Sequence, residues 1–157
     1  MKILFLYFVV ILMLSPINTS YSDYKKENIQ KSILTEMERI NMAVIVNAKI
    51  NNLDPLLIHA VIKPESEYFP KALSSKGCMG LMQVDPIVHK KLLVKLKLKK
   101  SDLFEIEPNI KVGTIVLKSY IKENHNSVLL GLKHYNGASD LRYANKVMRN
   151  YRKLKNQ

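Results

Sequence analysis

The 157-residue chain is long enough for one domain with its own hydrophobic core. Its 47% hydrophobic content excludes an intrinsically disordered chain, and 25 Lys and Arg against 13 Asp and Glu give a net charge of +12, which favours anionic partners or, equally well, reflects a solvated lysine-rich surface. The sequence has no zinc-finger spacing, and its aromatic residues do not alternate with basic ones, so we expect no nucleic acid partner.

The N-terminal segment has the layout of an export signal. Lys2 precedes an uncharged apolar run at residues 3–14, which is too short for a typical spanning helix but suits a signal peptide. Ser20 and Ser22 are small residues two apart, so residues 1–22 are predicted to be a signal peptide cleaved after Ser22, with cleavage after Ser20 as an alternative. We therefore expect export to the periplasm or cell envelope, with an uncleaved membrane tether as the other possibility.

The mature domain is predicted to be residues 23–157. Removal of Lys2 with the signal lowers the net charge from +12 to +11. Cys78 is the single cysteine of the chain, so no intramolecular disulfide can form and stability must come from packing. We expect its thiol to be buried and inert, because the spacing of the four histidines suggests no Cys–His pair.

Two helical segments are predicted before the centre of the chain. Residues 23–52 carry apolar side chains at three- and four-residue steps, which favours one helix or two with a packing role only. Asp54 and Pro55 then have the residue types of a helix cap and a first helical position. Pro64, ten residues after the cap, is expected to kink or end this second helix near Glu65.

The second half of the chain also has helical patterning. Residues 69–79 are predicted to be a loop, and residues 87–100 an amphipathic, very basic helix that either lies on an anionic surface or is simply solvated. Further helices are expected from Pro108 towards Glu123, over residues 127–135 with Ser127 as the cap, and over residues 140–154. Alternating strands are lacking, so the sequence predicts an all-α, mainly helical domain.

The stretch from Glu65 to Gln83 resembles a known family signature. It reads E-S-x-x-x-P-x-A-x-S-x-x-G-x-x-G-L-M-Q, which is similar to the soluble lytic transglycosylase catalytic domain of the lysozyme-like superfamily, related to goose-type lysozyme. Downstream, Tyr135-Asn136-Gly137 and the Tyr143-x-x-x-Val147 pattern match the family in the expected order. The resemblance covers roughly residues 47–148 and implies a lysozyme-like helical domain whose central loop forms the active-site cleft.

The residues themselves single out Glu65 as a proton donor. It is predicted to stand where a helix gives way to a loop, and apolar neighbours such as Ile62, Met82 and Tyr135 would raise its pKa by disfavouring the charged form. Glu67 is the rival, but residues two apart face different sides of a helix. No metal-ligand cluster and no phosphate-cradling glycine loop is seen in the sequence, so we expect no metal and no cofactor.

The resemblance implies a one-acid cleavage of peptidoglycan glycan strands at the MurNAc-GlcNAc β-1,4 bond. Glu65 would protonate the leaving oxygen, the substrate's N-acetyl group would stabilise the cation, and Glu65 would then activate the muramyl 6-hydroxyl to give a 1,6-anhydro sugar. Seven further residues are implied to hold the site or contact the glycan: Ser66, Ser74, Met82, Gln83, Tyr135, Asn136 and Tyr143. Ser74 can equally be only a loop residue, and Met82 only a core residue.

Three outcomes stay open for function. The chain is expected to be a monomeric lytic transglycosylase that opens the wall locally, for example for a secretion or conjugation machine. A hydrolytic muramidase is a variant that the sequence does not separate. A peptidoglycan-binding module that has lost turnover is the alternative from another class, and the unusual Pro64 beside Glu65 is its only sequence support.

Overall fold

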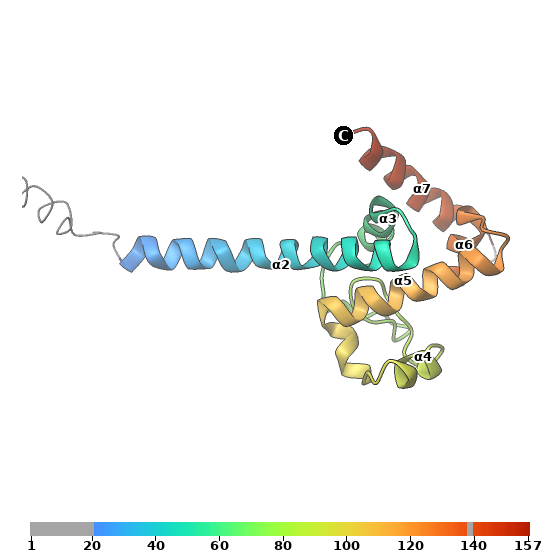
Figure 1. Ribbon diagram of the computed structural model, residues 1–157, viewed down its shortest axis with the longest axis horizontal. Coiled ribbons are helices and arrows are strands. Elements are labelled where there is room, and N and C mark those ends of the chain that lie inside the picture. The colour runs from blue at the N-terminus through green and yellow to red at the C-terminus, as the bar shows by residue number, and fades with distance from the viewer. Residues whose placement is uncertain (1–20, 138–139) are drawn as a thin grey trace, which may run out of the picture. The chain divides into compact units, whose positions relative to one another are not determined.

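The computed structural model describes residues 21–137 and 140–157, with side chains from Glu36 onward (Figure 1). The predicted signal peptide falls on residues 1–20, which lie outside this description, and on Tyr21 and Ser22, which begin a helix. The chain divides into two compact units, residues 1–36 and residues 37–157. No helix in the described part is both long and apolar enough to cross a bilayer.

Helices are the main regular structure of the described residues, as the sequence predicts. The elements in chain order are α2 (Tyr21–Asn51), α3 (Pro55–Ser66), α4 (Lys90–Lys95), the 3-10 helix η1 (Lys100–Phe104), α5 (Ile106–Glu123), α6 (Val128–Tyr135) and α7 (Arg142–Lys155). Extended pairing within the described residues is limited to two isolated antiparallel bridges, Leu73 with Met79 and Met79 with Val84. The prediction of a mainly α-helical domain is confirmed.

Helix α3 begins and ends where local chemistry requires. The Asp54 carboxylate accepts the Leu56 N–H at 2.9 Å, and Pro55 occupies the first helical position, where a missing N–H costs nothing. Pro64 lies inside the helix, which ends two residues later at Ser66. Glu67 then adopts a left-handed conformation with φ of 51° and caps the helix. The predicted end near Glu65 is therefore confirmed.

The loop after α3 has little regular structure but is held by one buried amide, Asn109 at the start of α5. Its Oδ1 accepts the Met82 N–H at 2.8 Å, and its Nδ2 donates to the Met79 and Leu103 carbonyls at 2.8 and 2.6 Å. Gly80, with φ of +71°, approaches so closely that an added Cβ would lie 2.2 Å from this amide. Asn109 thus replaces the backbone pairing that a strand would provide.

The predicted basic helix over residues 87–100 is wrong in length. Only Lys90–Lys95 form α4, and Lys97 leaves the helical region with φ of 56°. His89 stands at the N-cap position without a side-chain cap, and Leu93 is the one buried residue of this short helix. With so little buried surface, amphipathic spacing alone does not sustain a longer helix here.

The remaining helices begin close to the predicted residues, and the predicted cap of α6 is confirmed. Ser127 caps α6 by accepting the Leu130 N–H at 3.3 Å, and the Asp140 carboxylate accepts the Arg142 N–H at 2.9 Å where α7 begins. Helix α5 packs on α6, and α7 packs on both α3 and α6. This arrangement brings the start of α7 to the C-terminal end of α3, where Glu65 lies.

Candidate active site

Glu65 lies in the last turn of α3 and faces a cavity of about 190 Å³. The side chains around this cavity come from the loop after α3 and from the end of α6. Those lining it with Glu65 are Ser74, Lys76, Cys78, Gln83, Tyr135 and Asn136. The structure therefore brings Glu65 together with four residues of the predicted site: Ser74, Gln83, Tyr135 and Asn136.

Helix α7 supplies the direct partner of Glu65. The Tyr143 hydroxyl donates a hydrogen bond to Glu65 Oε1, joining two residues 78 positions apart. Oε2 of the same carboxyl has no hydrogen-bond partner among the described residues, so it is the oxygen open to the cavity. The geometry fixes one oxygen and leaves the other for a reacting group.

Burial governs the ionisation of Glu65. Removal from water raises the pKa of the Glu65 carboxyl, while the hydrogen bond from Tyr143 and the positive charge of Lys146 lower it, and burial outweighs both. A carboxyl with a raised pKa keeps its proton closer to neutral pH, as a general acid must. The contribution of Lys146 was missed by sequence reasoning, because nothing local places it near a residue 81 positions earlier.

Tyr135 and Ser66 tie the loop to the helices that flank it. The Tyr135 hydroxyl donates to the Met82 carbonyl at 2.7 Å, and burial raises the pKa of this phenol well above its ordinary value. The Ser66 hydroxyl donates to the Leu81 carbonyl at 2.8 Å. Both side chains bond the backbone beside Gly80, so in this structure they hold the wall of the cavity.

Ser74 and Gln83 also bond backbone groups of the loop. The Ser74 hydroxyl accepts the Cys78 N–H at 3.0 Å, closing the turn that contains Gly77. The Gln83 amide donates to the Ala72 and Gly80 carbonyls at 3.2 and 3.0 Å. Both residues line the cavity while they shape the loop, which combines the two interpretations offered for Ser74.

Met82 does not line the cavity. Its side chain is fully buried, its Sδ accepts the Thr114 hydroxyl at 3.8 Å, and it packs so tightly on Gly113 that an added Cβ there would lie 2.6 Å away. The prediction of a groove-lining Met82 side chain is therefore corrected to a core residue. Its backbone carbonyl remains the anchor for Tyr135.

Cys78 and Lys76 lie on the cavity wall. Cys78 is half-buried, so the prediction of a buried thiol is corrected: the residue lines the cavity. Lys76 was missed by sequence reasoning, where it was one of many lysines. The turn made by Ser74 and Gly77 carries it to the mouth of the cavity, where it is the one cationic residue of the lining.

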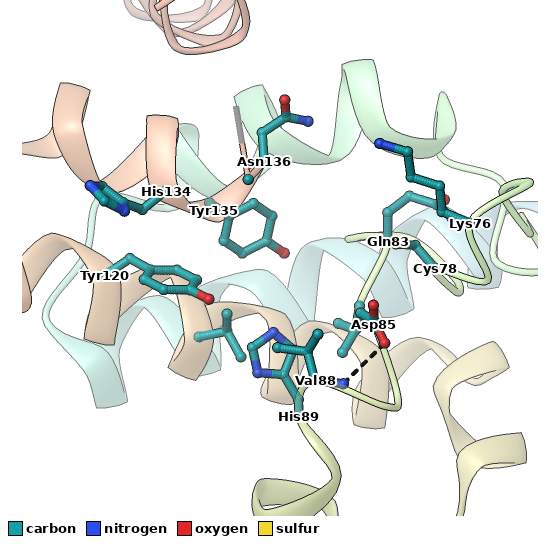
Figure 2. A pocket seen from close by; sticks show the side chains of 13 residues that line it. Lys76, Cys78, Gln83, Asp85, Val88, His89, Tyr120, His134, Tyr135 and Asn136 are labelled. Atoms are coloured by element: carbon teal, nitrogen blue, oxygen red, sulfur yellow. Dashed lines mark hydrogen bonds between the residues drawn. The ribbon is translucent and has the colours of Figure 1, made fainter. Parts of the chain in front are cut away.

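A second chamber of about 220 Å³ adjoins the first and shares five lining residues with it (Figure 2). Its own walls include Asp85, His89 and a stacked pair, Tyr120 and His134, with ring centroids 6.4 Å apart. The Asp85 Oδ1 accepts the Ile87 and Val88 N–H groups at 2.7 and 3.1 Å. Burial lowers the pKa of His89, against the opposing charge of Asp85. The two chambers lie next to each other along the residues they share, and we refer to them together as the groove.

Glu67 faces away from this groove. It occupies the left-handed cap of α3, is exposed, and lines neither chamber. The structure thus separates the two carboxylates that the sequence offered as rivals.

Comparison with known proteins identifies the family of the chain. The sequence profile of the Transglycosylase SLT domain matches residues 42–157. A transglycosylase of Enterobacteria phage PRD1 is 32% identical over 107 residues, covering 63% of this chain and 38% of the phage protein. The membrane-bound lytic murein transglycosylase F of Desulfosudis oleivorans is 29% identical over 137 residues, covering 83% of this chain and 28% of that protein. The chain therefore spans well under half the length of these relatives.

Solved structures agree at the level of the fold. An inactive mutant of lytic transglycosylase Slt from Pseudomonas aeruginosa matches 73% of this chain and 24% of its own, with a TM-score of 0.64 at 20% identity. The 70-kDa soluble lytic transglycosylase from Escherichia coli matches 71% of this chain and 18% of its own, with a TM-score of 0.58 at 21% identity. With the profile covering most of the sequence, the chain belongs to the Transglycosylase SLT domain family.

Proposed function

We propose that the protein is a lytic transglycosylase that cleaves the MurNAc-GlcNAc β-1,4 bond of peptidoglycan and forms 1,6-anhydromuramyl ends. One observation carries the proposal: the Glu65 carboxyl opens into a cavity, and burial raises its pKa. A carboxyl in that state can donate a proton at near-neutral pH and take one back within the same cycle.

In the proposed reaction the proton leaves Oε2 of Glu65 and bonds to the glycosidic oxygen as its bond to the muramyl anomeric carbon breaks. The N-acetyl oxygen of the muramyl sugar bonds to that carbon and stabilises the positive charge. Glu65, now a carboxylate, removes the proton of the muramyl 6-hydroxyl while that oxygen displaces the acetamido oxygen. Glu65 ends protonated and no water is consumed.

The neighbours of Glu65 support this assignment in distinct ways. The hydrogen bond from Tyr143 to Oε1 orients the carboxyl so that Oε2 points to the substrate, and it stabilises the carboxylate that forms midway. The side chains of Asn136 and Lys76 lie at the cavity wall and make no hydrogen bond or ion pair with other described residues, and we assign them contacts with the glycan or its peptide. Ser66, Ser74, Gln83 and Tyr135 keep the wall in shape.

A structural neighbour gives independent support. The Pseudomonas aeruginosa structure is of a variant in which a glutamate is replaced by glutamine, and that variant is described as inactive. The same dependence on one carboxyl is what we propose for Glu65. We also propose that the protein works in the cell envelope after export, where peptidoglycan lies, and that it opens the wall locally for a larger secretion or conjugation machine.

A hydrolytic muramidase is the second candidate, and Asp85 is the observation that favours it. Its carboxylate lines the chamber next to that of Glu65, and an inverting hydrolase needs a second carboxylate to activate water. Two backbone N–H groups already bond Asp85 Oδ1, so this oxygen is engaged in shaping the local backbone, which favours the one-acid reaction. The inactive binding module has less support, because Pro64 leaves Glu65 directed at Tyr143.

Mass spectrometry of the products released from purified sacculi tests the proposal. Anhydro-muropeptides are the expected result. Reducing ends would instead identify a hydrolase, and Asp85→Asn should then abolish their release. Intact sacculi with bound protein would overturn both enzyme assignments and leave the binding module.

A further inference from the structure

Helix α2 carries apolar side chains on two opposite faces within residues 37–51. Ile40, Val44 and Ala48 are buried in the core. The opposite face holds four exposed apolar residues: Met42 at 61%, Ile45 at 54%, Val46 at 49% and Ile50 at 72% exposure. Their spacing places them in one band along the helix, which we name the apolar stripe. Packing within the described chain does not explain it, since the core uses the other face.

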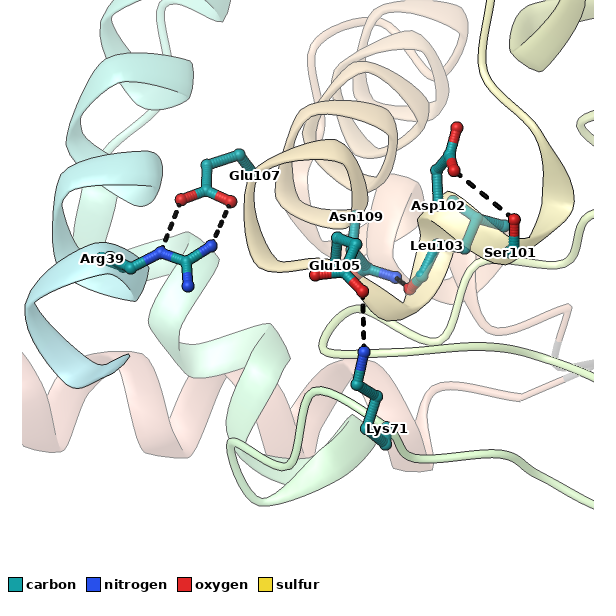
Figure 3. A network of polar contacts seen from close by, with 8 residues as sticks. All are labelled: Arg39, Lys71, Ser101, Asp102, Leu103, Glu105, Glu107 and Asn109. Carbon is teal, nitrogen blue, oxygen red and sulfur yellow. Dashed lines mark hydrogen bonds and ion pairs between the residues drawn. The ribbon is translucent and has the colours of Figure 1, made fainter. Parts of the chain in front are cut away.

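Two contacts locate helix α5 beside this stripe. Arg39, three residues before Met42 and on the same face of α2, forms a bidentate pair with Glu107 of α5 at 2.8 and 2.9 Å (Figure 3). Eleven residues further along α5, Lys118 Nζ donates to the Asn52 carbonyl just beyond α2, at 3.4 Å. One face of α5 therefore runs along the flank of the stripe.

That face of α5 is basic. Lys111, Lys118 and Lys122 follow Glu107 at spacings of four, seven and four residues, so they share its face, and Lys49 lies within the stripe itself. No ion pair to Lys49, Lys111 or Lys122 is found among the described residues, whereas Glu107 is neutralised by Arg39. Glu38, one turn before Met42, marks the N-terminal end of the stripe.

We propose that the apolar stripe and these four lysines form a docking surface for the anionic headgroups of a phospholipid bilayer. An apolar band flanked by lysines is the pattern with which a helix lies in a membrane interface, apolar side chains inserted and ammonium groups at the phosphates. A second copy fits less well, since each chain carries a net charge of +12 and the lysine rows would meet. The surface shares no residue with the groove and goes beyond the proposed activity.

The absence of tryptophan from the sequence allows a direct test in the full chain. Ile50→Trp introduces a single fluorophore into the stripe. Addition of phosphatidylglycerol vesicles should move its emission to shorter wavelength and make it quenchable by brominated acyl chains. Phosphatidylcholine vesicles should do so much less, and salt should reverse the effect because exposed charges are screened.

Val94→Trp is the matched control. Val94 is 69% exposed and lies among the lysines of α4. It therefore matches Ile50 in exposure and in having basic neighbours, but it lies outside the apolar stripe. Its emission should stay unchanged even if residues 1–22 attach the chain to the vesicles, since both variants share that segment. Equal shifts at both positions, or none at Ile50→Trp when the protein is bound, would overturn the proposal. A shift without vesicles that grows with protein concentration would identify self-association and also overturn it.

The lysines are tested in the Ile50→Trp background. Each of Lys111→Gln and Lys122→Gln should raise the phosphatidylglycerol concentration at half-maximal shift about fivefold, and the pair roughly 25-fold, given about 1 kcal/mol for each basic residue near an anionic surface. The α4 pair Lys91→Gln and Lys95→Gln is the control and should leave the midpoint unchanged. A midpoint that moves with the α4 pair instead would transfer the docking surface to α4 and contradict the proposal.

Discussion

The two sides of the last turn of α3 carry carboxylates in contrasting surroundings. On the inner side, Glu65 is partly buried, receives a hydrogen bond from Tyr143 and opens into the groove. On the outer side, Glu67 is exposed and serves the backbone as a left-handed cap. The residues are two apart and chemically identical, so their difference comes entirely from what the rest of the fold packs around them.

The comparison teaches that the chemistry of this site depends on distant segments. The inner side is made by the loop that Asn109 holds from α5, by Tyr135 from α6 and by Tyr143 from α7. Removing any of these contacts should leave Glu65 more exposed to solvent, as Glu67 is. Each change should therefore alter the surroundings of Glu65 and leave those of Glu67 as they are.

The largest expected effect is on turnover. Glu65→Gln keeps the size of the side chain and an acceptor for Tyr143 but has no transferable proton. The rate of muropeptide release from sacculi should fall by at least the roughly 10²–10⁴-fold typical of general acid–base catalysis. Glu67→Gln is the matched control and should keep most of the activity. Similar losses of activity in both variants would contradict the assignment of Glu65 as the proton donor.

The loop that forms the inner side should fail when Asn109 is removed. Asn109→Ala leaves the Met82 N–H and the Met79 and Leu103 carbonyls without their partner in a buried setting. With about 1–3 kcal/mol for each unsatisfied buried group, we expect a loss of about 3 kcal/mol or more in the free energy of unfolding. Urea denaturation measures it. Asn145→Ala, at an exposed position of α7, should change stability by less than about 0.5 kcal/mol.

Tyr143→Phe should change the pH profile of the reaction more than its maximum. The Tyr143 hydrogen bond lowers the pKa of Glu65, so its loss should raise that pKa further. Because the protonated acid is required, the alkaline limb of kcat/KM should move to higher pH, while the maximum falls roughly tenfold through loss of orientation. Tyr151→Phe, whose hydroxyl bonds Asp54 instead, should leave the limb in place. A limb that moves to lower pH would contradict the role given to Tyr143.

A smaller effect is expected on stability. A raised pKa in the folded state means that ionisation of Glu65 destabilises the fold as pH rises above the ordinary glutamate value of 4.5. Below that value both states carry a protonated carboxyl, so wild type and Glu65→Gln should be equally stable. Above it the Gln variant should become the more stable, with the difference growing until pH passes the folded-state pKa. Thermal unfolding across this range measures the difference, and a wild type favoured at neutral pH would refute the sign.

Local chemistry made much of the fold predictable. The helix start at Asp54 and Pro55, the helix end near Glu65 and the cap at Ser127 depend on neighbours within a few residues, and each is found as predicted. The basic segment at residues 87–100 failed because helix length there depends on tertiary contacts, which only Leu93 makes fully. The spacing of apolar residues in a sequence does not show whether the fold offers a surface on which they can be buried.

The site was predictable in composition but less so in geometry. The family motifs predicted Glu65 and Tyr143 as site residues, and the structure shows a hydrogen bond between them. The Met82 side chain is buried in the core because Thr114 and Gly113, some thirty positions away, accommodate it. Lys146 was not predicted, because its partner Glu65 is also distant in the sequence. Residues whose role depends on a remote partner leave no local signal.

Titration of the Glu65 carboxyl itself addresses the proton donor most directly. With glutamate labelled by ¹³C at the carboxyl carbon, the Glu65 resonance is assigned by its absence from Glu65→Gln, and its chemical shift is followed with pH. We predict a midpoint clearly above 4.5, displaced further upward in Tyr143→Phe. A Glu65 midpoint at or below 4.5 would mean that the carboxyl is ionised at neutral pH, and Glu65 would then not be the acid that starts the reaction.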